Sequence, residues 1–168
     1  NFLFAKKKLE YRNPGINKNI INTNNGNDNN VEVAHQDKYS FCIIGNLIPI
    51  KGHPILFRAL QKINNNNFIC YIIGSGTDDQ IIYLKTMTKK LNISNKVKFL
   101  GYVKNPLVIL NKCDFLISTS FSEASPRVIQ ESYHCKKPVV ATNVGGQTEL
   151  VIDDVTGYLV EPNNTRSI

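Results

Sequence analysis

Two glutamates, Glu123 and Glu131, lie eight positions apart around the expected start of a helix. The apolar run from Phe115 to Ile117 precedes them and predicts a buried strand. A helix that begins at Ser125 as cap acceptor, or at Pro126 in its first turn, leaves Glu123 in the preceding loop and places Glu131 about two turns inside. Free backbone N–H groups at a helix start suit an anion such as a diphosphate, and the flanking carboxylates accept hydrogen bonds from hydroxyls. Nucleotide sugars present both kinds of group.

The pattern continues in one register beyond the second glutamate. EASPRVIQE at Glu123–Glu131 is followed by KPVVATNVGG at Lys137–Gly146, then by Glu149-Leu150 and TGYLVEP at Thr156–Pro162. This stretch of about forty residues resembles the retaining GT-B glycosyltransferases of family 4 (group 1), and it is far more specific than a lone glycine-rich loop. The resemblance implies the C-terminal, nucleotide-sugar-binding domain of such an enzyme.

A second stretch, GNLIPIKG at Gly45–Gly52, resembles the family pattern G-R-L-x-x-x-K-G. The resemblance implies that Lys51 grips the donor diphosphate and, with Glu123, carries the catalytic role. Asn46 replaces the family arginine, which removes one fixed cation from the leaving group, although Asn still donates one hydrogen bond. The alternative for Lys51 is a solvated loop lysine.

The same resemblance assigns the residues around the helix start. Glu131 would bond the ribose hydroxyls, and Glu123 the hydroxyls of the transferred sugar. The backbone at Ala124, Ser125 and Pro126 would meet sugar and phosphate, in a place where many relatives have Gly-Phe-Pro. The alternative for Glu131 is an exposed helical glutamate.

Further donor-binding residues are assigned at neighbouring loops. Tyr102 and Val103 resemble the loop whose backbone reads the base, with plain packing as the alternative for Tyr102. Gly74 and Gly76 belong to a Gly-Ser-Gly stretch that is either part of the donor site or only a strand-to-helix turn. Val128 either abuts the ribose or fills the core.

Strand and helix patterns alternate through the chain and predict a Rossmann-like three-layer α/β/α domain with a mainly parallel sheet, the C-terminal half of a GT-B fold by resemblance. The expected strands are residues 39–44, 68–73, 97–100, 114–118, 138–142 and a short edge strand at 157–160. The expected helices are residues 54–63, 78–91, 105–111 and the glutamate-bearing helix. Ligands of such sheets bind beyond the carboxyl ends of the strands, so the glycine loops at 45, 74–76, 101 and 145–146 should line one crevice with the two glutamates.

Two parts are expected along the chain. Residues 1–36 would be an interdomain linker region with an Asn-rich loop at 18–30, and residues 37–168 the donor-binding domain. The chain does not begin with Met and has 168 residues, so we expect a piece of a longer protein with its acceptor domain before Asn1 and its C-terminus truncated.

Composition limits the class of partner. The net charge of +7 could indicate an anionic partner, but the basic residues are scattered and no basic stripe alternates with aromatics, so nucleic acid is not expected. Peripheral contact with an anionic membrane and a merely solvated basic surface stay open. The longest apolar runs are too short to span a bilayer.

Cysteines and histidines show no metal-ligand spacing. The four cysteines should behave as small hydrophobes in a reducing compartment, and they are Cys42, Cys70, Cys113 and Cys135. His35, His53 and His134 are expected to be structural or exposed, with His53 capping its helix and His134 near a helix C-terminus. Asp153 and Asp154 read as a solvated turn. No metal site is therefore expected. The resemblance implies that no cofactor is needed and that the donor substrate is a UDP- or GDP-linked sugar.

The resemblance implies an enzyme that transfers a sugar, with retention, from a nucleoside-diphosphate sugar to a saccharide or lipid-linked acceptor. The implied setting is the assembly of bacterial surface polysaccharide, capsule or lipopolysaccharide, in the cytoplasm or at the inner face of the membrane. Two other functions remain as alternatives: a nucleotide-sugar 2-epimerase of the same architecture, and a non-catalytic nucleotide- or sugar-binding module.

Overall fold

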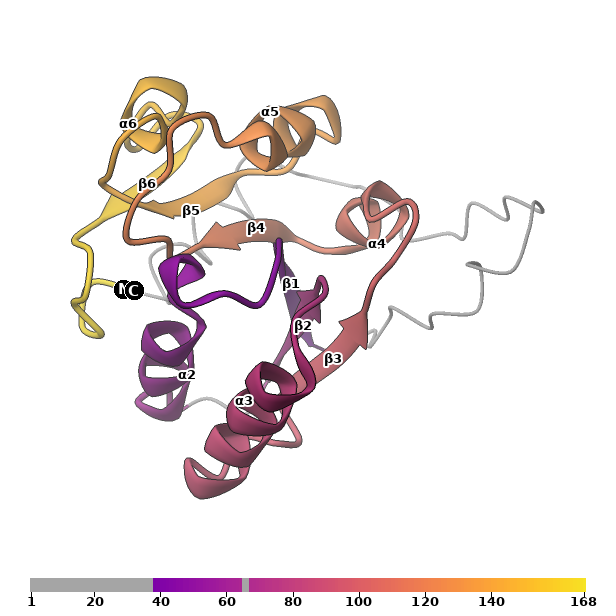
Figure 1. Ribbon diagram of the computed structural model, residues 1–168. Coiled ribbons are helices and arrows are strands. Elements are labelled where there is room, and N and C mark those ends of the chain that lie inside the picture. The colour runs from indigo at the N-terminus through magenta and orange to yellow at the C-terminus, as the bar shows by residue number, and fades with distance from the viewer. Residues whose placement is uncertain (1–37, 65–66) are drawn as a thin grey trace.

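A parallel sheet forms the centre of the structure, a computed structural model that describes residues 38–64 and 67–168 (Figure 1). Six strands are found in these residues, and their spatial order is β3-β2-β1-β4-β5-β6. Every neighbouring pair runs parallel. The strands are β1 Tyr39–Ile44, β2 Phe68–Ile73, β3 Val97–Gly101, β4 Phe115–Ser118, β5 Val139–Thr142 and β6 Gly157–Val160.

The inner strands are continuous apolar runs because helices cover both faces of the sheet. All six residues of β2 and all four of β4 are buried, and parallel sheets between two helical layers require such continuous apolar strands. The edge strands β3 and β6 are only partly buried. The expectation of a parallel sheet with a short edge strand at 157–160 is confirmed.

Helices cover both faces of the sheet (Figure 1). Helices α2 and α3 lie on one face, and α4, α5 and α6 lie on the other. Their bounds are α2 His53–Gln61, α3 Asp78–Lys90, α4 Leu107–Lys112, α5 Arg127–His134 and α6 Gln147–Leu150, with a short 3-10 helix, η1, at Pro49–Lys51. The three-layer α/β/α prediction is confirmed.

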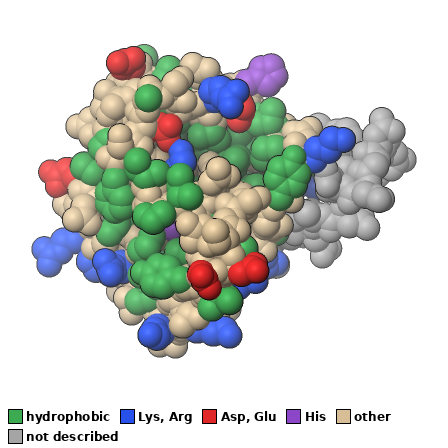
Figure 2. All heavy atoms as spheres, viewed as in Figure 1, with side chains coloured by type: hydrophobic (Ala, Val, Ile, Leu, Met, Phe, Trp, Pro, Cys, Tyr) green, Lys and Arg blue, Asp and Glu red, His purple; other side chains and the backbone are tan. Residues whose placement is uncertain are grey.

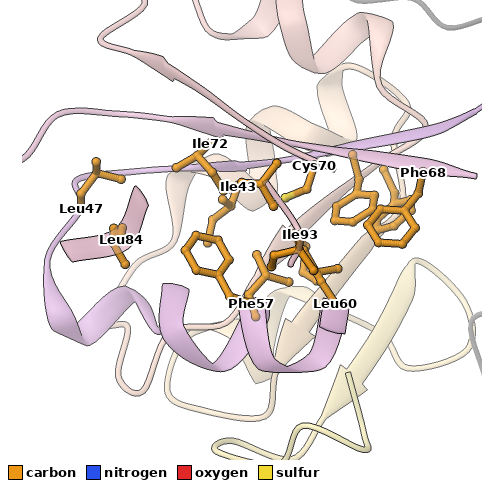
Figure 3. Close-up of a cluster of buried hydrophobic side chains, with 14 residues drawn as sticks. Ile43, Leu47, Phe57, Leu60, Phe68, Cys70, Ile72, Leu84 and Ile93 are labelled. Atoms are coloured by element: carbon orange, nitrogen blue, oxygen red, sulfur yellow. The ribbon is translucent and has the colours of Figure 1, made fainter. Parts of the chain in front are cut away.

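The core between the sheet and α2 is packed with large apolar side chains (Figure 3). Phe57 and Leu60 point from α2 toward the strands and belong to one cluster with Ile43, Ile72 and Phe68. Leu56, on the same helix, is fully buried. Burying a Leu or Phe side chain stabilises a fold by roughly 1.5–3 kcal/mol, so this layer fixes where the loop before α2 lies.

The opposite core contains most of the cysteines. Cys42 of β1 and Cys113 are buried there, and Cys135 packs against the same cluster. Cys70 belongs to the core on the α2 face. A hydrogen bond with Cys113, together with burial, raises the pKa of the Cys42 thiol, so this group stays protonated at neutral pH. The prediction that these cysteines behave as small hydrophobes is confirmed, and all four are free.

Two short elements were not predicted, namely η1 and α6. The predicted helix starts also shift: α2 begins at His53, one residue early, and α4 begins at Leu107, two residues late. The linker at 1–36, its Asn-rich loop and His35 lie outside the described residues.

Candidate functional site

The site lies where the strand order reverses direction. Successive connections lead from β1 outward to β2 and β3, and the chain then returns to β4 on the other side of β1. In open parallel sheets this switch point between two neighbouring strands leaves a ligand-binding position beyond their carboxyl ends. Lys51 follows β1 and Glu123 follows β4, so the topology brings both predicted catalytic residues to this position.

The loop before α2 is held against the loop after β4 by backbone contacts. Gly52 has a left-handed φ of 69°, and a Cβ added there would lie 2.0 Å from the Thr119 carbonyl oxygen. The Thr119 hydroxyl donates to the Lys51 carbonyl at 3.1 Å, and the Phe121 N–H donates to the Ile50 carbonyl at 2.8 Å. Only glycine permits this close approach with this backbone conformation, which is why the sequence has Gly after Lys51.

Lys51 and Glu123 form an ion pair in which the ammonium donates to the Glu123 carboxylate. Their side chains are 25% and 18% exposed, so neither is a freely solvated group. The Lys51 side chain also passes Gly45, where an added Cβ would lie 3.4 Å from its Cε. Lys51 is therefore not the solvated loop lysine that the sequence left open.

The loop after β5 packs against the backbone of Glu123. The Gly146 N–H donates to the Glu123 carbonyl at 2.7 Å, and a Cβ at Gly145 would lie 2.2 Å from the same oxygen. A Cβ at Gly146 would lie 2.3 Å from the Ala124 carbonyl oxygen. The glycine pair of the KPVVATNVGG segment thus holds the backbone of the glutamate loop in place.

The start of α5 differs from its prediction in two ways. The cap position is Pro126 with no side-chain hydrogen bond, so Ser125 is not a side-chain cap; its carbonyl instead accepts from the Arg127 N–H at 2.9 Å. Because α5 begins at Arg127, Glu131 lies about one turn inside rather than two. Within residues 38–64 and 67–168, no hydrogen bond takes up the N–H of Ala124 or of Ser125.

Glu131 is half-buried on α5, and so it is not the exposed helical glutamate that the sequence left open. No side chain in the described part of the chain bonds its carboxylate. Val128, one turn earlier on the same helix, packs against the core beneath α5. The core-filling role of Val128 is confirmed, and its contact with a ribose stays a prediction.

The glycines after β2 pack against the loop after β1. A Cβ at Gly74 would lie 1.9 Å from the Gly45 carbonyl oxygen, and one at Gly76 would lie 2.8 Å from the Leu47 Cβ. The Leu47 N–H also donates to the Ser75 carbonyl at 2.7 Å. Gly74 and Gly76 are therefore needed for loop packing at the edge of the site, whether or not they also touch a ligand.

Other predicted donor-binding residues lie at the ends of β1 and β3. Tyr102 is 76% exposed, so plain packing does not explain it. Val103 is half-buried, and Asn46, which replaces the family arginine, is exposed. The predicted roles of Asn46 at the diphosphate and of Tyr102 and Val103 at the base stay predictions.

His53 is structural, one of the two outcomes that the sequence predicted for it. It is 1% exposed at the start of α2, where Gly52 is the cap residue, so the prediction that His53 caps its helix is wrong. Its Nε2 is buried without a partner among the described residues. Burial, and then the charge of Lys51, lower the pKa of His53 from 6.5 to about 4, so the imidazole is neutral beside the site at pH 7.

The remaining polar residues singled out in the sequence lie apart from this pair. His134 is exposed in the last turn of α5, as expected. Asp153 and Asp154 are exposed, and Asp153 accepts from the Leu159 N–H at 2.9 Å. In the described ranges no group of three or more His, Cys, Asp or Glu is arranged to hold a metal ion.

Large apolar side chains are exposed on the loops that carry the ion pair. Ile48, Ile50 and Phe121 are 39%, 43% and 43% exposed on the same two loops. On the face drawn in Figure 2, hydrophobic side chains gather around an acidic and a basic side chain near the centre. Charged groups with apolar neighbours interact more strongly than they do in bulk water.

Comparison with known families agrees with this geometry. Residues 24–168 match the model of the family described as glycosyl transferases group 1, so the chain belongs to that family. The finer assignment to family 4 stays a prediction. A relative from Campylobacter jejuni subsp. jejuni serotype O:2, N-acetylgalactosamine-N,N'-diacetylbacillosaminyl-diphospho-undecaprenol 4-alpha-N-acetylgalactosaminyltransferase, is 33% identical over 171 residues, which cover 100% of this chain and 44% of that protein. The chain spans less than half the length of the curated relatives it matches.

Solved structures share the fold. Anabaena Alr3699/HepE in complex with UDP is 31% identical, with a TM-score of 0.74 over 78% of this chain and 37% of that one. The complex of the same protein with UDP-glucose gives 32% identity and a TM-score of 0.72 over 77% of this chain and 36% of that one. Both comparisons support a Rossmann-like domain of a GT-B glycosyltransferase.

Proposed function

We propose that this chain is the donor-binding part of a retaining glycosyltransferase, which holds a nucleoside-diphosphate sugar while the sugar is transferred to a saccharide or lipid-linked acceptor. The ion pair of Lys51 and Glu123 at the topological switch point is the observation that carries the proposal. It places a cation beside a carboxylate that can accept hydrogen bonds from hydroxyls. This carboxylate belongs to the loop before α5.

In this proposal each residue of the site binds a different part of the donor. The Lys51 ammonium and the unbonded N–H groups of Ala124 and Ser125 meet the diphosphate. Glu123 accepts from the sugar hydroxyls, and Glu131 accepts from the ribose hydroxyls. A half-buried carboxylate that no neighbour bonds is expected to gain from such a partner.

Catalysis would rest on stabilising the departing nucleoside diphosphate. Negative charge develops on the leaving oxygen as the bond from the sugar breaks, and a fixed cation with backbone donors lowers the energy of that state. Because Lys51 supplies this charge, we propose that no metal or other cofactor takes part. The partial neutralisation of Lys51 by Glu123 is consistent with a role that begins only when the donor is bound.

The acceptor and cellular setting come from the relatives. The Campylobacter protein is named for a diphospho-undecaprenol-linked acceptor, and the Saccharomyces cerevisiae relative for phosphatidylinositol. We therefore propose a lipid-linked or saccharide acceptor, a bacterial surface-polysaccharide setting, and action in the cytoplasm with peripheral contact at an anionic membrane. In the part of the chain that is described, no helix has the length and apolar character needed to cross a membrane.

Calorimetric titration with UDP, GDP, ADP and their sugar conjugates tests the proposal. One nucleotide should bind, and Lys51→Ala should weaken its diphosphate binding by about 10- to 100-fold, the usual worth of a hydrogen bond to a charged group. Glu131→Ala should weaken it by about tenfold through the ribose. Lys112→Ala, an exposed lysine at the end of α4, is the matched control and should bind normally. Failure of all three diphosphates and of their sugar conjugates to bind, or equal binding by Lys51→Ala, contradicts the proposal.

A further inference from the structure

Lys51 and Glu123 are each other's partner in the structure. Lys51 donates to Glu123, so the cation proposed for the diphosphate is already occupied by the carboxylate proposed for the sugar. A ligand that takes only one member of the pair leaves the other without its partner. A ligand that bonds both the Lys51 ammonium and the Glu123 carboxylate gives each group a new partner in place of the other.

The exchange needs side-chain motion only. The Lys51 backbone is held by the Thr119 hydroxyl, and the Glu123 backbone by the Gly146 N–H. The two side chains keep 25% and 18% of their surface exposed, so a ligand can reach them. Gly45, which has no side chain, leaves open the space beside the Lys51 methylenes.

We propose that Glu123 distinguishes a complete nucleotide sugar from the spent nucleoside diphosphate by competing for Lys51. This inference rests on the proposed function. A nucleotide sugar offers its diphosphate to Lys51 and its hydroxyls to Glu123, so both members of the pair gain a new partner. No covalent bond changes in this exchange.

A nucleoside diphosphate without its sugar offers only the anion. Lys51 must then leave Glu123, and the carboxylate stays partly buried near a second anion with no hydroxyl to bond it. Both effects oppose binding, because an unpaired buried charge and a like-charged neighbour each cost free energy. Glu123 therefore recaptures Lys51 once the sugar has gone, which weakens binding of the product and favours its release.

Replacing the carboxylate by its amide separates the two ligands. In Glu123→Gln the competing charge is gone, so UDP should bind about three- to tenfold tighter than to the unaltered chain. UDP-glucose should gain less or lose affinity, so the preference for the complete donor falls. GDP with GDP-mannose and ADP with ADP-glucose are titrated in the same way to cover the other bases. Glu161→Gln, an exposed residue with the same change of charge, is the control and should leave both affinities unchanged.

A second measurement needs no nucleotide. Brief acetylation with acetic anhydride, followed by mass spectrometry, reports how freely each lysine side chain meets the reagent. Release of Lys51 in Glu123→Gln should raise its labelling about two- to fivefold, comparable to the loss of an ion pair of ordinary strength. Lys112 and Lys136, both exposed, serve as internal references.

The outcomes separate the two claims. If Lys51→Ala weakens a diphosphate but Glu123→Gln does not tighten it, the competition is overturned and the donor-binding function stands. Unchanged Lys51 labelling in Glu123→Gln also overturns the competition, since the carboxylate then does not hold the ammonium. If neither a diphosphate nor its sugar conjugate binds the unaltered chain, the proposed function fails and the inference fails with it, even where labelling detects the pair.

Discussion

Protonation of His53 is expected to destabilise the fold as the pH falls. The imidazole is 1% exposed, and its Nε2 has no partner among the residues described. Burial, with a smaller effect of Lys51, lowers its pKa from 6.5 to about 4. The folded protein therefore resists a proton that the unfolded chain accepts.

The size of the effect follows from this difference in pKa. Between pH 6.5 and 4 the unfolded chain binds more protons at His53 than the folded chain, so the free energy of unfolding falls as the pH falls through this window. Integrated over the window, the loss is about 2 kcal/mol at pH 5 and about 3 kcal/mol at pH 4, relative to pH 7. A domain of ordinary stability, roughly 5–15 kcal/mol, would lose a substantial share.

Urea unfolding at pH 7, 6 and 5 measures this loss. His53→Gln cannot be protonated in this range, so its free energy of unfolding should fall less than that of the unaltered chain, by about 2 kcal/mol at pH 5. Other titrating groups are common to both proteins and cancel in the comparison. His134→Gln, which removes an exposed histidine, is the matched control. Equal pH dependence in His53→Gln and the unaltered chain would refute the reasoning.

Two further substitutions, each with its own control, test the packing that positions the site. All are measured by urea unfolding at pH 7. Gly145→Ala should lower the free energy of unfolding by about 2–4 kcal/mol, because its Cβ would lie 2.2 Å from the Glu123 carbonyl oxygen at a φ of 46°. Gly101→Ala has a similar φ of 70° but meets nothing within 4 Å, so it should lose only about 1 kcal/mol, and an equal loss in both would contradict the contact. Leu56→Ala should lose about 2–5 kcal/mol by leaving a cavity at a fully buried position, whereas Ile82→Ala, 61% exposed, should stay within about 0.5 kcal/mol; similar losses would contradict the assigned core.

The sheet could be predicted from the sequence because its strands are short apolar runs that end at glycine or polar residues. The sequence predicts Tyr39–Ile44 and Phe68–Ile73 with their observed bounds, because a buried parallel strand is apolar on both faces and its limits are easy to recognise. The helix α5 was harder to place, because Pro126 and Ser125 both suit a helix start and only tertiary contacts decide between them.

The ion pair could not be predicted from the sequence, and neither could the choice between a buried and an exposed His53. Lys51 and Glu123 are 72 positions apart, and their contact depends on the docking of Gly52 against Thr119. Nothing in the local pattern fixes such a long-range approach. The sequence leaves His53 either structural or exposed, and only the packing of α2 decides that it is buried. The short helix α6 has four residues, too few for a period of apolar positions to be read.

Mapping of backbone amide signals by NMR during titration with a nucleoside diphosphate tests the central claim most directly. If the chain binds the donor at the switch point, the largest shifts should fall in residues 45–52 and 123–131, and they should be lost in Lys51→Ala. The amide chemical shifts of α3 beyond its first turn should stay unchanged, because this part of the helix packs on one face of the sheet. Binding that shifts α3 or the β6 edge while leaving both loops unchanged would contradict a donor site at Lys51 and Glu123.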